Sequence, residues 1–345
     1  MKDKIILVAI FGLLMLITPA IFNGKASVMT DKTVKPAISA SKAPNVGTKT
    51  AQSSSIPTSS EKIRVLVVKT GKVEEMDTQK YICGVVAAEM PVEFNSEALK
   101  AQAVDAYTYA LRRIAQEKQS PDSTHKGASL CTNSAHCCAY LSVDELKTKW
   151  GSHFTLNWKK ITDAVQTVFG KAMFYQDEPV AAVFHSISAG VTENAKDIWG
   201  TDVAYLQEVE SPGDKLAPGY LSKVTVKQED FKTKISAKWK DANLTTTPDK
   251  WVTEITRSKA GSVLTCKVGG VAVTGGEIRE VFNLRSTNFE ISFSNKTFNF
   301  SVKGYGHGVG LSQYGADYMA RQGKKWDEIL KYYYVGIEIK DTKLV

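Results

Sequence analysis

The chain has 345 residues, a formal net charge of +8 and 5 cysteines. Seven lysines and two aspartates among residues 1–60 account for +5 of that charge, and the +3 that remains is too small for a nucleic-acid-binding face. Five cysteines in a chain of this length exclude a disulfide scaffold, and their odd number leaves at least one without an intrachain partner.

An apolar segment lies at the N-terminus. Residues 5–22 follow Lys2, Asp3 and Lys4 and contain no charged residue, which is close to the ~20 residues of a membrane-spanning helix. The segment is a membrane helix or a signal peptide, and its length without an immediate small-x-small site favours an uncleaved anchor over 1–22. The two lysines place its short end in the cytoplasm and the rest of the chain outside.

Residues 23–61 are predicted to form a flexible extracytoplasmic linker. They contain no aromatic residue and are rich in Ser, Thr, Ala, Pro and Lys, so they bury too little apolar area to offset the entropy of ordering. We expect ordered structure from Lys62 onward and assign 62–345 to one large region.

A strand over 63–68 and a turn at 70–72 precede a helix that Asp77 caps. This helix ends at Ala88-Glu89-Met90-Pro91, because an X-Pro step disfavours helical backbone. Glu89 is the single carboxylate of an apolar run, so burial is expected to raise its pKa and make it a general acid for cleavage at an acetal oxygen. The alternative is a structural glutamate that turns to solvent at the helix end.

A second helix is predicted to begin at Asn95-Ser96 after a short link. It has an apolar stripe at helical spacing and, beside it, a polar stripe containing Gln102, Tyr109 and Arg113, with Asp105 next to them. Such a stripe is either the solvated side of the helix or, if the two helices pack as a hairpin, a face presented to a cleft.

Residues 120–140 concentrate soft metal ligands. His125, Cys131, His136, Cys137 and Cys138 lie within fourteen residues among small polar ones, as a tetrahedral zinc site on an inserted loop requires. Two of the cysteines could instead form a disulfide, but that leaves both histidines unexplained. Four protein ligands would make the site structural, with no open catalytic position.

The next segment combines helices with a polar run. A capping box starts a helix at Ser142, a longer helix is predicted over 157–169, and strands are predicted over 172–175 and 180–184. The second strand leads into His185-Ser186-Ile187-Ser188 and on to Asn194, a cluster of neutral donors and acceptors of the kind that holds sugars.

Residues 220–300 alternate strand and helix signals and include a hairpin signature at Gly269-Gly270. No catalytic motif is recognisable there, so this part is expected to be scaffold, with Cys266 a buried inert thiol.

The C-terminal part contains four glycines at every second position, Gly304 to Gly310, which permit unusual backbone angles and close approach of a ligand or another backbone. The spacing is not that of a phosphate loop. Helices are predicted from Ser312 to Arg321 and over 325–334. The whole pattern predicts an α+β fold, with one large two-lobed catalytic region and a central cleft.

Three separated motifs together resemble the stage II sporulation protein D (SpoIID) family of peptidoglycan lytic transglycosylases. They are Ala88-Glu89-Met90-Pro91 with residues 97–110, His185-Ser186 to Glu193 with Trp199-Gly200 and Tyr205-Leu206, and the glycine motif continuing through Leu311-Ser312-Gln313-Tyr314-Gly315-Ala316. The resemblance spans residues 62–340.

The resemblance implies a membrane-anchored enzyme that acts in the space between mother cell and forespore membranes during engulfment. It implies cleavage between N-acetylmuramic acid (MurNAc) and N-acetylglucosamine (GlcNAc) to leave 1,6-anhydro ends, with Glu89 as the essential acid, and a sporulation amidase and a membrane scaffold as partners. The candidate substrate-binding residues are polar members of the motifs: Gln102, Tyr107, Tyr109, His185, Ser186, Ser188, Asn194, Tyr205 and Gln313.

Two features qualify the resemblance. Tyr107 stands where the family commonly has an arginine. The spacing of His125, Cys131, His136 and Cys137 resembles the zinc-bearing clostridial branch, which implies that those four are the ligands and that Cys138 is free.

The chemistry is compatible with the family. Ordinary glycosidases need two carboxylates, whereas a lytic transglycosylase needs one acid and no cofactor, because the sugar's own 6-hydroxyl replaces water. Glu193 is the rival second carboxylate and would indicate hydrolysis. A glycan-binding activator of an amidase and a zinc hydrolase are the alternative functions.

Overall fold

The computed structural model describes residues 61–344. The predicted anchor over 1–22 and the linker up to residue 60 therefore lie outside the described residues. Within 61–344, no helix has the length and hydrophobicity needed to cross a bilayer. The described chain contains both helices and strands, and the strands form several small sheets, which confirms the predicted α+β class.

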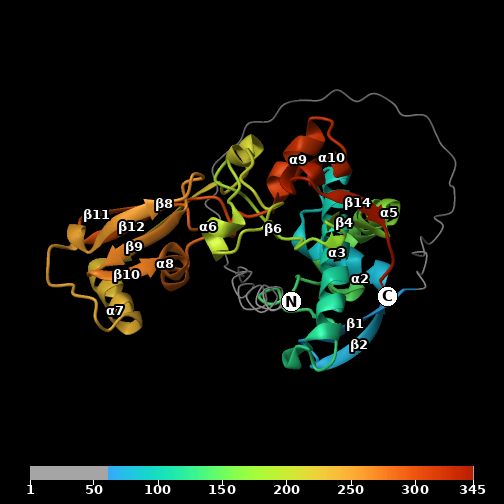
Figure 1. Cartoon of the computed structure of the whole chain (residues 1–345), viewed down its shortest axis with the longest axis horizontal. Coiled ribbons are helices and arrows are strands. Elements are labelled where there is room, and N and C mark those ends of the chain that lie inside the picture. The colour runs from blue at the N-terminus through green and yellow to red at the C-terminus, as the bar shows by residue number, and fades with distance from the viewer. Residues whose placement is uncertain (1–60, 345) are drawn as a thin grey trace.

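The larger hydrophobic core combines elements from both ends of the chain (Figure 1). From the N-terminal side come β1 (Lys62–Val67), β2 (Lys72–Asp77), α2 (Thr78–Glu89), α3 (Ser96–Gln119), β3 (Leu130–Cys131), α4 (Val143–Trp150), α5 (Phe154–Val168), β4 (Lys171–Tyr175), β5 (Glu178–Pro179), β6 (Phe184–His185) and α6 (Ala195–Trp199). From the C-terminal side come β13 (Leu311–Ser312), α9 (Gln313–Arg321), α10 (Trp326–Tyr333) and β14 (Glu338–Asp341).

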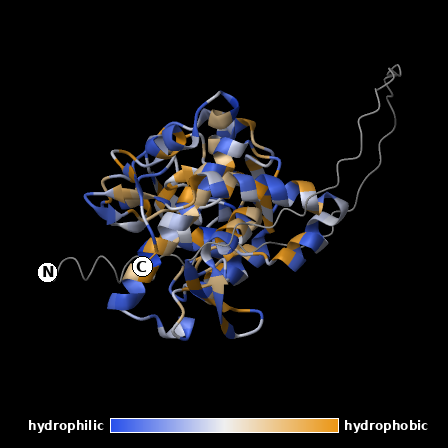
Figure 2. Ribbon diagram, turned by 90° about the vertical axis from the view of Figure 1, so that its right-hand side faces the viewer, coloured by the Kyte–Doolittle hydropathy of each residue, from blue (hydrophilic) through white to orange (hydrophobic). Residues whose placement is uncertain are grey.

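A second, separate core is formed by the segment between these two sets. Its elements are β7 (Leu221–Lys227), α7 (Gln228–Lys238), β8 (Val252–Arg257), β9 (Val263–Val268), β10 (Val271–Thr274), α8 (Gly275–Phe282), β11 (Phe289–Ser294) and β12 (Thr297–Lys303). Two antiparallel sheets, ordered β10-β9-β8 and β11-β12-β7, enclose aromatic side chains such as Phe231 and Phe298, whose ring centroids are 3.8 Å apart. In Figure 1 this segment lies at the left, and Figure 2 shows hydrophobic and hydrophilic residues alternating along the helices and strands.

Four of the predicted helix starts are confirmed by their side-chain caps, whereas the helix predicted over 157–169 begins earlier, at Phe154, without one. Asp77 accepts a hydrogen bond from the amide of Lys80, and Asn95 accepts one from Glu97. Ser142 forms the predicted capping box with Glu145, and the Ser312 side chain accepts from Gly315. Each cap satisfies an amide that would otherwise lack a partner at the helix N-terminus, which is why these starts can be recognised locally.

Two local predictions need correction. The strand expected over 180–184 is interrupted, with β5 ending at Pro179 and β6 beginning at Phe184. The segment 120–140 is not loop alone, because Leu130 and Cys131 form β3, which pairs in parallel with Val65 and Leu66 of β1. In both cases long-range pairing determines the strand.

The glycine motif closes the fold onto the polar run that begins at His185. Gly304, Gly306, Gly308 and Gly310 all have positive φ, between 72° and 117°. A Cβ added at Gly310 would lie 2.2 Å from the carbonyl oxygen of Val183, so this close approach requires glycine. The contact lets β13 pair in parallel with β6 and places Ser312 beside His185.

Candidate active site

Glu89 is the last residue of α2, whose other side chains are almost all buried. The residue as a whole is partly exposed, and its Oε1 accepts a hydrogen bond of 2.6 Å from the backbone amide of Ala139. Burial raises the pKa of Glu89 to about 7, although the Ala139 amide favours the ionised form. A substantial fraction of this acid is therefore protonated at neutral pH.

Glu89 lines a cavity of about 680 Å³ whose walls come from both hydrophobic cores. The larger core contributes Glu89, Tyr109, Cys138, Ala139, His185, Ser186, Trp199 and Gln313, among others. The second core contributes Val263, Leu264, Thr265, Thr274, Gly276, Glu277, Arg279, Glu280 and Thr287. Residues 220–300, which were expected to be scaffold, therefore also form one wall of the cavity.

Four of the predicted substrate-binding residues line this cavity with Glu89: Tyr109, His185, Ser186 and Gln313. Burial lowers the pKa of His185 to about 4, so its imidazole is neutral. Its Nδ1 lies 3.1 Å from the carbonyl oxygen of Val309, and its Nε2 has no hydrogen-bond partner among residues 61–344. That nitrogen is itself buried, in a residue that lines the cavity.

Gln102 lies one layer behind the cavity surface. Its side-chain oxygen accepts a hydrogen bond of 3.2 Å from the amide of Gln313, which does line the cavity. Gln102 is fully buried, so it positions Gln313 and is not itself among the lining residues.

Tyr107 points elsewhere. Its hydroxyl donates to Oε2 of Glu61 at 3.0 Å and its ring packs edge-on against Phe169. Tyr107 and Tyr109 are two positions apart in the sequence, which turns their side chains to nearly opposite sides of α3. The structure therefore does not bring Tyr107 to the cavity.

Three further predicted residues hold loops and are not among the lining residues. Ser188 donates its backbone amide to Asp214 and its hydroxyl accepts from Gly190. Asn194 caps α6 with its side-chain oxygen. The Tyr205 hydroxyl accepts a hydrogen bond from the amide of Ala181 at 2.7 Å.

Asp105 is a buried acid that sequence reasoning did not assign to the site. It is fully buried on α3, it accepts a hydrogen bond from the Tyr334 hydroxyl, and its Oδ1 has no partner among the described residues. Burial, and to a smaller extent the charge of Glu89, raises the pKa of Asp105 to about 7. Its helical spacing from Gln102 and Tyr109 was the available signal.

Other carboxylates differ from Glu89 in their surroundings. Glu193, the predicted rival, is buried but is not among the lining residues of the cavity. Burial raises the pKa of Glu193, and hydrogen bonds from Ser262 and Ser258 partly offset that rise. Glu277 and Glu280 do line it, but Glu277 closes the capping box of α8 and Glu280 pairs with Lys238 at 3.4 Å. Asp197 also lines the cavity and is exposed.

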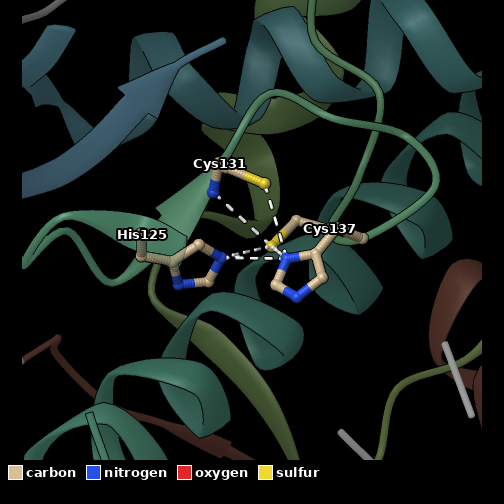
Figure 3. A group of neighbouring side chains, drawn as sticks. His125, Cys131 and Cys137 are labelled. Atoms are coloured by element: carbon tan, nitrogen blue, oxygen red, sulfur yellow. Dashed lines mark hydrogen bonds between the residues drawn. The ribbon is translucent and has the colours of Figure 1, made fainter. Parts of the chain in front are cut away.

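The four predicted metal ligands converge in space, and Figure 3 shows three of them, His125, Cys131 and Cys137, pointing toward one another. One ligand atom from each of His125, Cys131, His136 and Cys137 lies within 4.8 Å of all the others. Four of the distances between these atoms run from 3.0 Å, between His125 Nε2 and His136 Nδ1, to 3.7 Å, between Cys137 Sγ and His136 Nδ1. Tetrahedral zinc bonds of ~2.0–2.3 Å require edges of ~3.3–3.8 Å. Three of the four distances lie in this range, and the 3.0 Å distance between the histidine nitrogens is slightly shorter, so the donor set suits a single ion.

Carboxylates flank the outer nitrogens of both histidines. Glu117 Oε2 lies 3.7 Å from His125 Nδ1, and Asp122 Oδ2 lies 3.3 Å from His136 Nε2. Such partners orient metal-binding imidazoles and fix their tautomers. Cys138 does not belong to the group, is buried, and lines the cavity beside Glu89.

Comparison with known proteins identifies the family. The SpoIID model, described as stage II sporulation protein, matches residues 68–175, which include Glu89. The chain is 36% identical over 351 residues to stage II sporulation protein D of Bacillus subtilis strain 168, covering 99% of this chain and 97% of the relative. It is 41% identical over 271 residues to the protein of that name from Bacillus amyloliquefaciens, covering 78% and 76%.

These matches define a sporulation protein. The chain belongs to the stage II sporulation protein D family, which confirms the resemblance drawn from the three motifs. A more distant relative, named amidase enhancer, from Bacillus subtilis strain 168 is 26% identical over 302 residues, covering 73% of this chain and 39% of the relative. Membership of a zinc-bearing clostridial branch stays a prediction.

Proposed function

We propose that this sporulation protein is a lytic transglycosylase that cleaves peptidoglycan between MurNAc and GlcNAc with Glu89 as its single general acid and base. The observation that carries the proposal is the position of Glu89 at the wall of a large cavity, with its pKa raised to about 7. Of the other acids in the lining, Asp197 is exposed, Glu277 closes the capping box of α8 and Glu280 pairs with Lys238. Asp105 is buried and is not among the lining residues.

The proposed reaction requires one proton to make a round trip. Protonated Glu89 gives its proton to the glycosidic oxygen as the bond from that oxygen to the MurNAc anomeric carbon breaks. The 6-hydroxyl of the same MurNAc bonds to the anomeric carbon, and its proton passes to the Glu89 carboxylate. The products are a GlcNAc hydroxyl and a 1,6-anhydro-MurNAc end, so neither water nor a cofactor is consumed. A pKa near 7 suits both roles of the carboxyl group.

The remaining lining suits a sugar. Tyr109, His185, Ser186 and Gln313 present neutral donors and acceptors, and Trp199 and Tyr305 add aromatic surface. Pockets that combine apolar walls with a few convergent polar groups are typical binding sites. We assign Tyr109, His185, Ser186 and Gln313 to substrate binding and Gln102 to the support of Gln313.

We propose that the metal held by His125, Cys131, His136 and Cys137 is a structural Zn²⁺. Two thiolates and two imidazoles would fill all four ligand positions of a tetrahedral ion, which would leave none for a substrate or for the water of a zinc hydrolase. The ion would supply no chemistry to the reaction and would hold the segment that carries Ala139.

The proposed site of action is extracytoplasmic. An anchor over 1–22 would hold the enzyme on the membrane between mother cell and forespore, where engulfment requires the wall to be cut. Its partners would be glycan strands, a sporulation amidase and a membrane scaffold, in keeping with the sporulation relatives.

A second candidate function is a non-catalytic glycan-binding protein that activates an amidase, which the distant relative named amidase enhancer supports. Purified protein incubated with peptidoglycan distinguishes the two. Anhydro-ended products that are absent with Glu89→Gln establish the enzyme. Faster peptide release only with added amidase, and no anhydro ends, would establish the activator.

A further inference from the structure

Arg279 on α8 is a buried cation that faces the cavity. Its side chain is only 6% exposed although it belongs to the lining. It is the single lysine or arginine among the described lining residues, and burial lowers the pKa of both histidines there, so those are neutral. The described part of the cavity lining therefore has one fixed positive charge, on the wall contributed by the second core.

Within residues 61–344, this charge has no anionic partner. The Nε of Arg279 donates to the carbonyl oxygen of Leu284 at 3.3 Å, whereas its two terminal nitrogens have no hydrogen-bond or ion-pair partner among residues 61–344. The neighbouring acids are engaged elsewhere, since Glu277 caps α8 and Glu280 pairs with Lys238. Arginine is almost never this buried unless paired, because desolvating an isolated charge is costly.

From this geometry we infer that Arg279 binds a carboxylate carried by the glycan and makes the site selective for acidic over neutral glycan. The inference rests on the proposed function. Muramic acid differs from glucosamine by a lactyl ether that ends in a carboxyl group, and a planar guanidinium binds a carboxylate through two parallel hydrogen bonds. The carboxylate is that of a lactyl group free of peptide, or one on the stem peptide.

Binding to the full-length Glu89→Gln chain, measured by calorimetry, tests this without turnover. The probes are peptide-free glycan strands, the same strands with lactyl carboxylates converted to methylamides, and peptide-bearing strands. Adding Arg279→Gln is expected to weaken binding of the carboxylate-bearing strands by about 10- to 100-fold, the usual worth of a hydrogen bond to a charged group. Binding of the methylamide strands should not change.

Comparing the three kinds of glycan strand also identifies the source of the carboxylate. A loss with peptide-free strands identifies the lactyl carboxylate, and a loss confined to peptide-bearing strands identifies the stem peptide. Equal effects of Arg279→Gln on acidic and methylamide strands, or no effect on either, would overturn the inference.

Two further variants separate binding from folding. Lys232→Gln removes one exposed charge from α7 of the same core and should leave all affinities unchanged. Arg279→Lys keeps the charge but loses the planar guanidinium, so it should retain a reduced preference for acidic strands. This variant provides the test if Arg279→Gln fails to fold. Failure of the proposed function would appear separately, as the absence of anhydro products from the unmodified protein.

Discussion

The backbone amide of Ala139 donates a 2.6 Å hydrogen bond to Oε1 of Glu89. Ala139 follows the predicted metal ligand Cys137 by two residues, and Cys137, Cys138 and Ala139 all line the cavity. The metal-binding segment therefore holds a direct partner of the candidate acid. Loss of the metal is expected to affect catalysis through this contact as well as through stability.

Replacing Glu89 by glutamine should lower kcat/KM for glycan cleavage by ~10² or more, because an amide cannot donate and recover a proton. Glutamine keeps the size and the oxygen that accepts from Ala139, so the fold should be retained. Release of anhydro-ended fragments is the measurement. Glu93→Gln, at an exposed position outside the cavity, is the matched control and should cut at the normal rate. A Glu89→Gln rate close to that of the unmodified protein would refute the assignment.

The pH dependence of cleavage should follow the protonated form of Glu89. Since burial raises its pKa to about 7, kcat/KM should be level below this pH and decline above it. Asp105 titrates in the same range and is coupled to Glu89, so the apparent pKa belongs to the pair. Initial rates from pH 5 to 9 on one soluble glycan would show this, and activity that rises steadily above pH 8 would contradict it.

The raised pKa of Glu89 also determines the direction in which the stability of the fold changes with pH. Between the ordinary pKa of 4.5 and the folded value of about 7, the folded state binds more protons than the unfolded state. Stability contributed by Glu89 is therefore lost as pH rises through that window. Glu89→Gln should match the unmodified protein in free energy of unfolding at pH 4 and exceed it at pH 8, by at most on the order of 3 kcal/mol. Urea titrations at both pH values measure the difference; a variant that is less stable at pH 8 would show that burial does not penalise this carboxylate.

One zinc ion per chain is expected, bound at ~2.3 Å from sulfur and ~2.0–2.1 Å from nitrogen. Elemental analysis and X-ray absorption of protein purified without added metal would measure both. Cys137→Ser should lose the ion, whereas Cys266→Ser, in the second core, should keep it. Affinity should weaken on acidification because the thiolates must be deprotonated.

Chelation should lower both Tm and cleavage, because the segment carrying Ala139 would be released from the metal. If the protein instead contains no zinc and is about two mass units light, an oxidised pair of cysteines replaces the metal.

Gly310→Ala should destabilise the fold by about 3 kcal/mol or more, because the new Cβ would lie 2.2 Å from the carbonyl oxygen of Val183 at a φ of +72°. Gly323→Ala is the control, since its φ of +92° carries backbone strain but no atom lies within 4 Å of the new Cβ. That change should cost only about 1–2 kcal/mol. Urea titration compares them, and equal losses would show that close approach at β13 is not limiting.

The features that the sequence by itself determined are local. The starts of α2, α3, α4 and α9 are marked by capping side chains a few residues from the amides they satisfy. The four predicted metal ligands lie within thirteen consecutive residues, so a short segment can bring them together and their spacing alone indicates the site. Glu89 was recognisable because a lone carboxylate ends an apolar helix, and the strands of the second core because their alternation and turns are short-range patterns.

Only the tertiary structure decided which side chains meet at the cavity. The contact between Asp105 and Tyr334 joins residues 229 positions apart, and Arg279 reaches the cavity from a core in which no motif was visible. Tyr107 and Tyr109 are both tyrosines of α3, but they lie on different faces of the helix, and only Tyr109 lines the cavity. Helical periodicity shows which residues share a face, but which element packs against that face depends on contacts between segments far apart in the chain, and those contacts have no local signature.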